Sequence, residues 1–232
     1  MNSKVILITG SRKGIGRKLA EYFIRKKYIV VGCSRTDSDL ISNNYFHFTL
    51  DVSDELLVKK MFSFVRKEFK KIDFLINNAG LASMNHFILT PTSSFDKLTN
   101  TNFKGTFLFT REASKLMIKN KFGRIINFST VASPLNLEGE AVYASTKAAV
   151  EKLTKITARE LGSFGITVNA IGPTPIQTDL IKAVPKNKIQ ELLNSQSIKR
   201  LGEFNDLINV IDFLLRNESN FITGQIIYLG GV

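Results

Sequence analysis

The sequence predicts a single α/β domain of the Rossmann type, with a doubly wound, parallel, seven-stranded sheet and helices on both faces. Short apolar runs alternate with longer amphipathic segments from one end of the chain to the other, and the apolar runs contain little polar alternation. Strands that are covered on both faces have this composition. A strand–helix–strand rhythm gives parallel strands joined by right-handed crossovers. The 232 residues suffice for one such domain, expected to span 1–232.

Seven short apolar runs are the expected strands of this sheet. Helical segments lie between these runs, and the first of them carries an apolar stripe, Ile15, Leu19, Phe23 and Ile24, with charged residues on its other face. In doubly wound sheets, ligands bind beyond the carboxyl ends of the strands, so the residues that follow each strand are the candidates for function. The strands are VILIT (5–9), YIVVGC (28–33), FHFTL (46–50), IDFLIN (72–77), GRIINFS (123–129), ITVNAI (166–171) and QIIYL (225–229).

Composition narrows the possible sites and partners. Cys33 is the single cysteine, so neither a disulfide framework nor a thiolate metal cluster is possible, and His47 and His86 lie too far apart in sequence to suggest a metal site. The net charge of +12 is spread along the chain without a recognition motif, so no specific nucleic-acid partner is expected. No apolar run reaches the ~20 residues of a membrane span or the length of a signal peptide. We therefore expect a cytoplasmic protein.

The loop after the first strand, ITGSRKGIGRKLA, has the composition of a dinucleotide-binding turn. Its glycines follow a strand and open a helix, so the backbone can approach a pyrophosphate while the helix N-terminus offers free N–H groups. A Walker P-loop is excluded, because it would need GK[ST] at 15–17, where the chain has IGR. The loop residues expected to contact the cofactor are Gly10, Arg12, Lys13, Gly14, Ile15 and Gly16.

A tyrosine and a lysine stand four residues apart in the stretch EGEAVYASTKAAVEKL, residues 138–153. In a helix, Tyr143 and Lys147 would share one face. A neighbouring cation favours phenolate and lowers the pKa of a phenol, which is ~10 when unperturbed. The pattern fits either an ordinary amphipathic helix or a phenol tuned for proton exchange, and the spacing alone does not decide between them.

Taken together, three motifs resemble those of the short-chain dehydrogenases/reductases. They are TGxxxGxG at the first loop, NNAG at 77–80 and YxxxK at 143–147, in that family's order and separations. The resemblance extends to NTNFKG, GRIINFST, GITVNAIGP and ITGQIIYLGG, and so covers essentially the whole chain. The chain looks most similar to the members that reduce 3-oxoacyl groups on acyl carrier protein.

The resemblance implies a catalytic role for four residues. Tyr143 would be the general acid/base, and Lys147 would lower its pKa and hold the nicotinamide ribose. Thr130 stands where the family usually has the serine that polarises the substrate oxygen; Ser129 is the alternative, but in an alternating strand it should point to the other face. Asn102, in NTNFKG, matches the asparagine that anchors a water relay to the lysine. Standing alone it would be read as a capping or surface residue.

The resemblance also implies contacts along a bound nicotinamide cofactor. The segment 77–80 would line the adenosine and stabilise the central strand, and 51–52 would contact the adenine, although an Asp before Ser53 could also serve a helix start. The turn GPTPIQTDL would cover the nicotinamide, with Thr174 in place of a frequent glycine. The cofactor-contacting residues implied in these segments are Asp51, Val52, Asn78, Ala79, Gly80, Pro173, Ile176 and Thr178, together with Tyr143 and Lys147.

The charge pattern after the second strand predicts NADP(H) rather than NAD(H). NAD-preferring members have an acid there for the ribose 2′-OH, whereas this chain has Ser34 and Arg35. Serine and arginine can hydrogen-bond and neutralise a 2′-phosphate, and the nearby Arg12 and Lys13 add positive charge. Asp37 and Asp39 lie too far along the chain to replace the missing acid.

The expected function is NADPH-dependent reduction of a ketone to an alcohol, on a small-molecule or acyl-carrier-bound substrate. Family members that dock the carrier protein have basic residues ahead of GR and of GITVN; Lys121 matches the first and Phe164 departs from the second. A reductase or dehydrogenase of a sugar, polyol or specialised metabolite is the alternative, and a non-catalytic NADP sensor is a further one. The resemblance implies a homotetramer or homodimer, built partly through the helix that carries Tyr143 and the C-terminal segment.

Overall fold

The computed structural model describes residues 3–176 and 186–232 and is built around one seven-stranded sheet. The strand order is β3-β2-β1-β4-β5-β6-β7, and every neighbouring pair is parallel. The chain runs outward from β1 in both directions, so the order reverses between β1 and β4. The strands are β1 (Val5–Thr9), β2 (Ile29–Ser34), β3 (Tyr45–Thr49), β4 (Phe74–Asn77), β5 (Gly123–Phe128), β6 (Ile166–Gly172) and β7 (Ile226–Tyr228).

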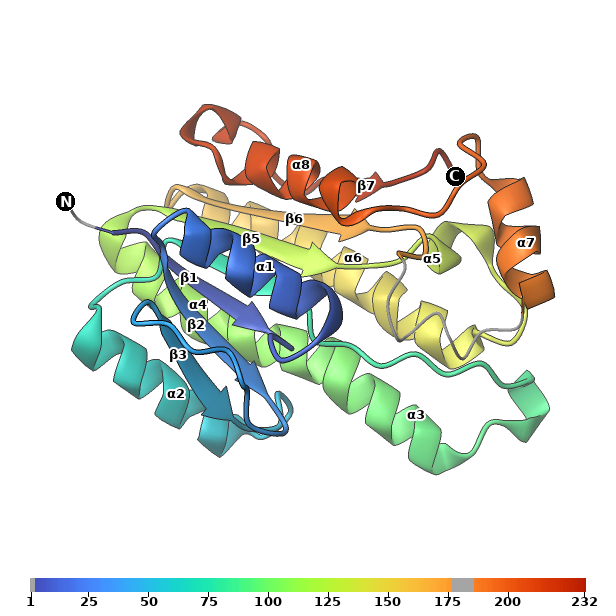
Figure 1. Ribbon diagram of the computed structural model, residues 1–232, viewed down its shortest axis with the longest axis horizontal. Helices are drawn as coiled ribbons and strands as arrows, with labels where there is room; N and C mark the ends of the chain where they lie inside the picture. The colour runs from blue at the N-terminus through green and yellow to red at the C-terminus, as the bar shows by residue number, and fades with distance from the viewer. Residues whose placement is uncertain (1–2, 177–185) are drawn as a thin grey trace.

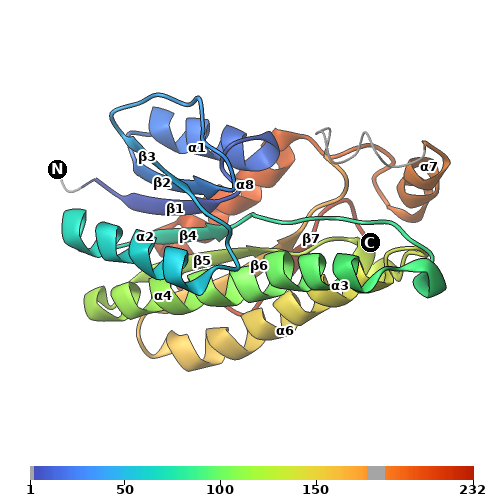
Figure 2. The same cartoon turned by 90° about the horizontal axis from the view of Figure 1, so that it is seen from below.

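Helices cover both faces of the sheet. Seen from below, α1 (Gly14–Arg25) and α8 (Phe204–Leu215) lie on one face, while α2 (Glu55–Glu68), α4 (Gly105–Asn120) and α6 (Ala141–Gly162) lie on the other (Figures 1 and 2). The sheet therefore separates two apolar clusters. Val5 and Leu7 pack in the cluster beside α2 and α4, whereas Ile6 and Ile8 pack in the cluster beside α1 and α8. Alternate side chains of one strand point to opposite faces, which is why a strand between two helical layers must be apolar throughout.

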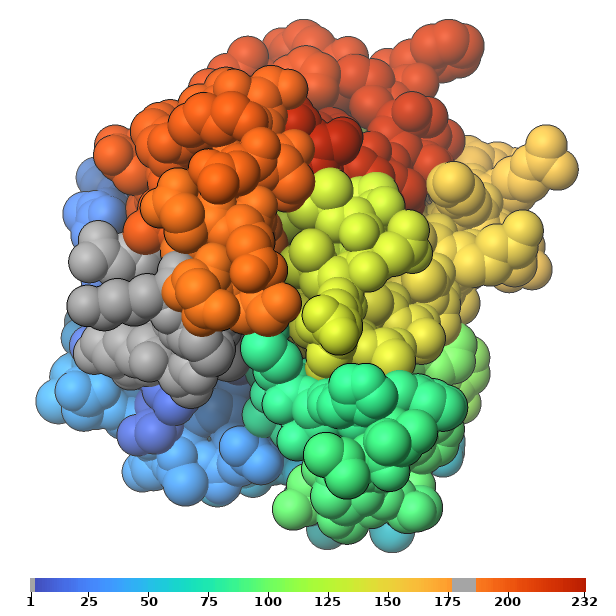
Figure 3. All heavy atoms as spheres, turned by 90° about the vertical axis from the view of Figure 1, so that its right-hand side faces the viewer, coloured from blue at the N-terminus to red at the C-terminus, as the bar shows by residue number. Residues whose placement is uncertain are grey.

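The shorter elements lie mostly toward the carboxyl ends of the strands. In the run from α3 through η2 into α4, the middle element is a π-helix. Figure 3 looks onto this end of the molecule, where the orange α7, the yellow-green segment around α5 and the green segment around η1 come together. These elements are η1 (Phe87–Leu89), α3 (Thr92–Leu98), η2 (Thr99–Lys104), α5 (Ala132–Leu135) and α7 (Lys186–Ser195); η4 (Asn217–Ser219) precedes β7.

The strands agree with the sequence prediction to within one residue at most ends. The clearest difference is β4, which begins at Phe74, two residues later than predicted. The reason is local: the Asp73 carboxylate accepts the Val5 N–H at 2.8 Å, where a strand would use a backbone carbonyl. The doubly wound, parallel sheet predicted from the sequence is confirmed.

Within residues 3–176 and 186–232, no helix combines the length and the apolar character needed to cross a membrane. In the same part of the chain, no group of three or more His, Cys, Asp and Glu side chains is placed to bind a metal ion.

Candidate active site

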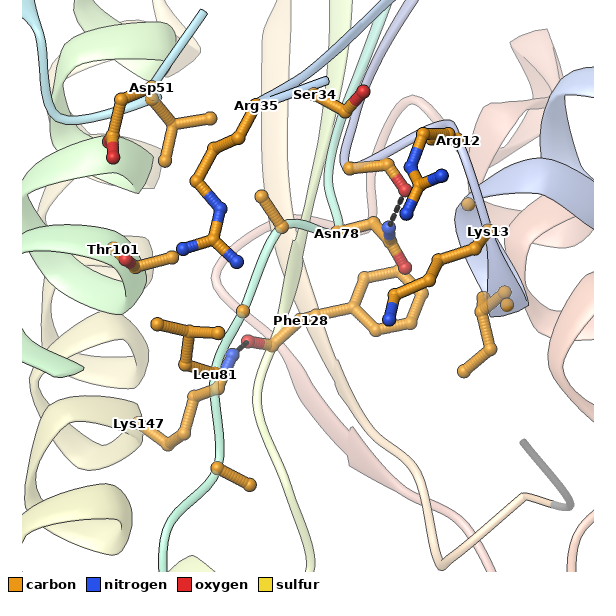
Figure 4. Close-up of a pocket in the computed structure, with 18 of the residues that line it drawn as sticks. Arg12, Lys13, Ser34, Arg35, Asp51, Asn78, Leu81, Thr101, Phe128 and Lys147 are labelled. Atoms are coloured by element: carbon orange, nitrogen blue, oxygen red, sulfur yellow. Dashed lines mark hydrogen bonds between the residues drawn. The ribbon is translucent and has the colours of Figure 1, made fainter. Parts of the chain in front are cut away.

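A cavity of about 720 Å³ opens at the carboxyl ends of β1, β2, β4 and β5, where the strand order reverses (Figure 4). This is the location that the doubly wound topology predicts. Most of the residues proposed for cofactor binding line it, although they come from widely separated parts of the chain. They are Gly10, Arg12, Lys13, Gly14, Ile15, Gly16, Ser34, Arg35, Asp51, Val52, Asn78, Ala79, Gly80, Tyr143, Lys147 and Pro173.

The glycine loop brings bare backbone to the wall of this cavity. Gly10 and Gly14 adopt φ of +70° and +59°, a region that residues with a Cβ rarely enter. A Cβ on Gly16 would lie 2.1 Å from the Gly10 carbonyl oxygen, so the loop can close only with glycine at this position. Helix α1 then begins without a side-chain cap, which leaves its first N–H groups available to an anion in the cavity.

Amide groups from the segment that follows β4 hold the loop in place. Asn78 Nδ2 donates to the Thr9 carbonyl at 2.8 Å, and the Ala79 N–H donates to Thr9 Oγ1 at 2.9 Å. Asn77 points the other way, into the core, where its Nδ2 donates to Thr110 Oγ1 and Asn127 Oδ1. The segment 77–80 therefore both lines the cavity and ties the central strands to the helices behind them.

One corner of the cavity is strongly basic. Arg12, Lys13 and Arg35 extend from the two loops at the ends of β1 and β2, with Ser34 between them (Figure 4). In the described part of the chain, the nearby acids are engaged elsewhere: Asp39 pairs with Arg17, and Asp37 accepts the Ser38 N–H. Asp51 also lines the cavity, but its carboxylate accepts from the Ser53 N–H and hydroxyl in the turn before α2, and the N-cap of that helix is Asp54.

Tyr143 and Lys147 lie on the buried face of α6, at the inner end of the cavity. Lys147 is 4% exposed, and its Nζ donates to the Phe128 carbonyl at 2.7 Å. Burial disfavours the ammonium and lowers the pKa of Lys147 to about 8. Burial likewise raises the pKa of Tyr143 to about 12, against a smaller lowering by a hydrogen bond with Thr130. The neighbouring charge of Glu140 also raises the pKa of Tyr143, so the lowering expected from Lys147 is not seen.

Thr130, and not Ser129, is the hydroxyl that faces Tyr143. The Thr130 side chain lies close enough to the phenol to lower its pKa, whereas the Ser129 hydroxyl donates to the carboxylate of Glu151. Ser129 still lines the cavity, but its donor is committed to α6. The alternation argument from the sequence therefore selected the residue whose side chain meets the phenol.

Asn102 is fully buried within the π-helix η2 and is not a surface or capping residue. Its side chain pairs with both backbone groups of Leu81, at 2.8 and 2.9 Å, and donates to Thr146 Oγ1 at 3.0 Å. A Cβ on Gly80 would lie 3.5 Å from both Asn102 Oδ1 and Lys147 Nζ, so these groups surround the same point. Asn102 thus clamps the 80–81 segment beside Lys147. π-Helical turns of this kind occur frequently at functional sites.

Ile176, proposed for the nicotinamide end, does not line the cavity. Ile176 forms an isolated bridge with Gly202 and packs in the apolar cluster beside α8. Its side chain is buried in that cluster. Thr178 lies outside the described residues.

Several lining residues were missed by the sequence analysis. Leu50, Leu81 and Phe128 directly adjoin segments that were identified, and the carboxyl-end rule could have found them. No sequence pattern pointed to Thr101. It lines the cavity because it lies in the π-helix η2, just before Asn102, and the sequence analysis did not predict that turn. The lining residues absent from the prediction are Thr36, Leu50, Leu81, Ala82, Thr101, Phe128 and Ser129.

Comparison with known proteins agrees with this geometry. A family model described as "Enoyl-(Acyl carrier protein) reductase" matches residues 10–231. The 3-oxoacyl-[acyl-carrier-protein] reductase FabG of Staphylococcus aureus is 33% identical over 239 residues, which cover 99% of this chain and 97% of that protein.

Solved structures of related oxidoreductases superpose over nearly the whole chain. ElxO with NADP bound has a TM-score of 0.89 and 33% identity, and covers 98% of this chain and 97% of its own. A 4-hydroxyisoleucine dehydrogenase complexed with NADH has a TM-score of 0.86 and 27% identity, with 99% and 98% covered. The sequence motifs, the sheet order and these matches lead to one conclusion: the chain belongs to the short-chain dehydrogenase/reductase family of oxidoreductases.

Proposed function

We propose that the protein is an NADPH-dependent reductase that converts a ketone to an alcohol. The observation that carries the proposal is the contact between Tyr143 and Thr130, with Lys147 buried one helical turn away, at the inner end of a cavity lined by a glycine loop. In the family, a nicotinamide cofactor bound in such a cavity supplies the hydride. The chain must then provide a proton and a hydrogen bond for the substrate oxygen.

Tyr143 is suited to be the proton donor. With a pKa of about 12, the phenol is protonated at neutral pH, which is the form that a general acid needs. Thr130 Oγ1 would hydrogen-bond the same substrate oxygen and orient it toward the phenol. Lys147 would hold the ribose side of the cofactor, where its two remaining ammonium protons are free of Phe128. In this scheme Asn102 acts through Leu81, by fixing the wall beside Lys147.

The basic corner supports NADP(H) as the cofactor. Arg12, Lys13 and Arg35 gather where the adenosine end of a dinucleotide would lie, and β2 ends in Ser34 where a carboxylate would repel a 2′-phosphate. ElxO, with NADP bound, is a neighbour that fits this preference, whereas the dehydrogenase with NADH shows that the fold also accepts the other cofactor.

The relatives point to two substrate classes, an acyl group on a carrier protein and a small metabolite. Resemblance to FabG favours a 3-oxoacyl group carried on an acidic carrier protein, which the net charge of +12 would attract. Lys121 ends α4, but the second expected basic position is Phe164, a 40% exposed apolar side chain. The 4-hydroxyisoleucine dehydrogenase favours a small metabolite instead. We further propose a single domain that works in the cytoplasm as a homodimer or homotetramer.

The test is NADPH oxidation at 340 nm with a panel of ketones that includes acetoacetyl-CoA, a 3-oxoacyl carrier protein and small hydroxy-acid or sugar-derived ketones. We expect turnover of one class, and a loss of at least about 100-fold in kcat for Tyr143→Phe, as for removal of a general acid. Tight NADPH binding by both proteins without turnover of any ketone would contradict the reductase proposal and favour a sensor.

A further inference from the structure

A chain of hydrogen bonds runs behind the basic corner of the cavity and ends at Ser34. Ser11 Oγ lies 2.8 Å from Tyr45 OH, which lies 2.8 Å from His47 Nδ1. The other ring nitrogen, His47 Nε2, lies 3.0 Å from Ser34 Oγ and 3.2 Å from the Thr36 carbonyl oxygen. Ser11 belongs to the glycine loop and Ser34 ends β2, so β3 links the two walls of the corner from behind.

The partners of this chain determine where its hydrogens lie. The Thr36 carbonyl can only accept, so His47 Nε2 carries a hydrogen and donates. Ser34 Oγ donates its one hydrogen to the same carbonyl at 2.5 Å and therefore accepts from His47. In the neutral imidazole, Nδ1 then accepts from Tyr45 OH, which in turn accepts from Ser11. The network assigns the Nε2–H tautomer to His47.

This arrangement leaves the Ser34 hydroxyl turned away from the cavity. Its hydroxyl points away from Arg35 and the interior (Figure 4), and its only donor is committed to Thr36. To meet an anion in the cavity, the hydroxyl must rotate and release the Thr36 carbonyl. Thr36 is exposed, so water can replace part of this hydrogen bond, and the cost of its loss opposes the rotation only modestly.

His47 can remove that cost, because its Nε2–H already reaches both oxygens. We propose that His47 is a positioning residue for cofactor selection: it takes over the Thr36 carbonyl when the Ser34 hydroxyl turns to the 2′-phosphate of NADP(H). The inference rests on the proposed NADP(H) function. The role of His47 differs from that of Arg12, Lys13 and Arg35. These three side chains attract the phosphate by charge, and no hydrogen bond has to change partners for them to do so. NADH has a ribose 2′-hydroxyl at this position and no phosphate, so its binding does not require the rotation.

The test is a titration of NADPH and NADH against the wild type, His47→Phe, Ser34→Ala and the double variant, followed by cofactor fluorescence. One hydrogen bond between neutral groups contributes about 1 kcal/mol, so His47→Phe should weaken NADPH binding about 3- to 10-fold. The affinity for NADH should change less than about 2-fold. In the Ser34→Ala background, His47→Phe should have no further effect, because the hydroxyl that it serves is gone.

Two further variants separate positioning from mere packing. His47→Gln keeps an N–H donor at a similar reach and should restore part of the NADPH preference. His86→Phe changes the other, exposed histidine before η1 and should leave both affinities unchanged. Phe should be accommodated at residue 47, since Phe46 and Phe48 flank it on β3, and a thermal melt of each variant checks this.

The outcomes distinguish this inference from the proposed function. Equal weakening of NADPH and NADH in His47→Phe, or additive losses in the double variant, would show a purely structural residue and overturn the inference alone. A wild type that binds NADH as tightly as NADPH would overturn the proposed cofactor preference and the inference together.

Discussion

At the scale of single residues, burial shifts the pKa of both groups in the Tyr143–Lys147 pair toward their neutral forms. The phenol is held protonated and the ammonium is made easier to deprotonate, since desolvation penalises whichever form is charged. The sequence suggested the reverse for tyrosine, because spacing shows a neighbouring cation and does not show how much water either group loses. A protonated phenol suits the donation of a proton during ketone reduction.

The shift of Lys147 predicts how stability depends on pH in the ligand-free protein. Its pKa falls from 10.5 to about 8 on folding, so between these values the unfolded chain binds more protons. The free energy of unfolding should therefore rise with pH across this window. Lys147→Met removes the titration. Between pH 7.5 and 10.5, the free energy of unfolding of the wild type should rise by about 3 kcal/mol relative to that of this variant, at ~1.4 kcal/mol per pKa unit.

Urea unfolding of both proteins at several pH values measures this gain. The pKa of Tyr143 is raised above its ordinary 10.0 in the folded protein, so this residue lowers the free energy of unfolding as pH rises. That effect begins only near the upper end of the pH window. A difference between wild type and variant that does not change with pH would show that Lys147 is charged in the folded state.

At the scale of elements, the glycines in the turn from β1 into α1 let the backbone come close to a ligand in the cavity, and they do not add to stability. Gly16→Ala would put a Cβ 2.1 Å from the Gly10 carbonyl and displace the loop that faces the cavity. We expect NADPH binding to weaken by at least about 10-fold, because the loop N–H groups no longer converge on the pyrophosphate. Isothermal titration calorimetry would measure the change.

Gly162→Ala is the matched control for this substitution. Gly162 ends α6, has an ordinary negative φ, and a Cβ there meets no atom within 4 Å. Alanine at such a position should leave NADPH binding unchanged and raise the free energy of unfolding by about 0.4–1 kcal/mol. Equal effects of the two substitutions on affinity would contradict the role given to the glycine loop.

At the scale of the whole molecule, one sheet joins all parts of the described chain, and both apolar clusters extend along it. We therefore expect a single cooperative thermal transition. NADPH at about 100 times its dissociation constant should add ~2.7 kcal/mol of stability and raise Tm by roughly 5–10 °C for a domain of this size. Differential scanning calorimetry would measure both; two transitions, of which NADPH shifts one, would contradict a single domain.

Much of the fold followed from the chain itself, for physical reasons that are local. Apolar runs without alternation identify strands buried on both faces, and the glycines after VILIT identify a turn that must bring backbone close to a ligand. Thr130 was distinguished from Ser129 by its place in the family motif and by strand alternation. These features depend on neighbours within a few residues, so the sequence by itself determined them.

Only the tertiary structure decided the properties that depend on distant segments. The depth at which Tyr143 and Lys147 lie is set by the packing of α6 against β5, and that depth controls both pKa values. Ile176 packs in the core and forms a bridge with Gly202, and His47 reaches Ser34 because β3 pairs with β2. Desolvation and hydrogen-bond partners are set by atoms that meet only in the folded chain, so no local pattern contains them.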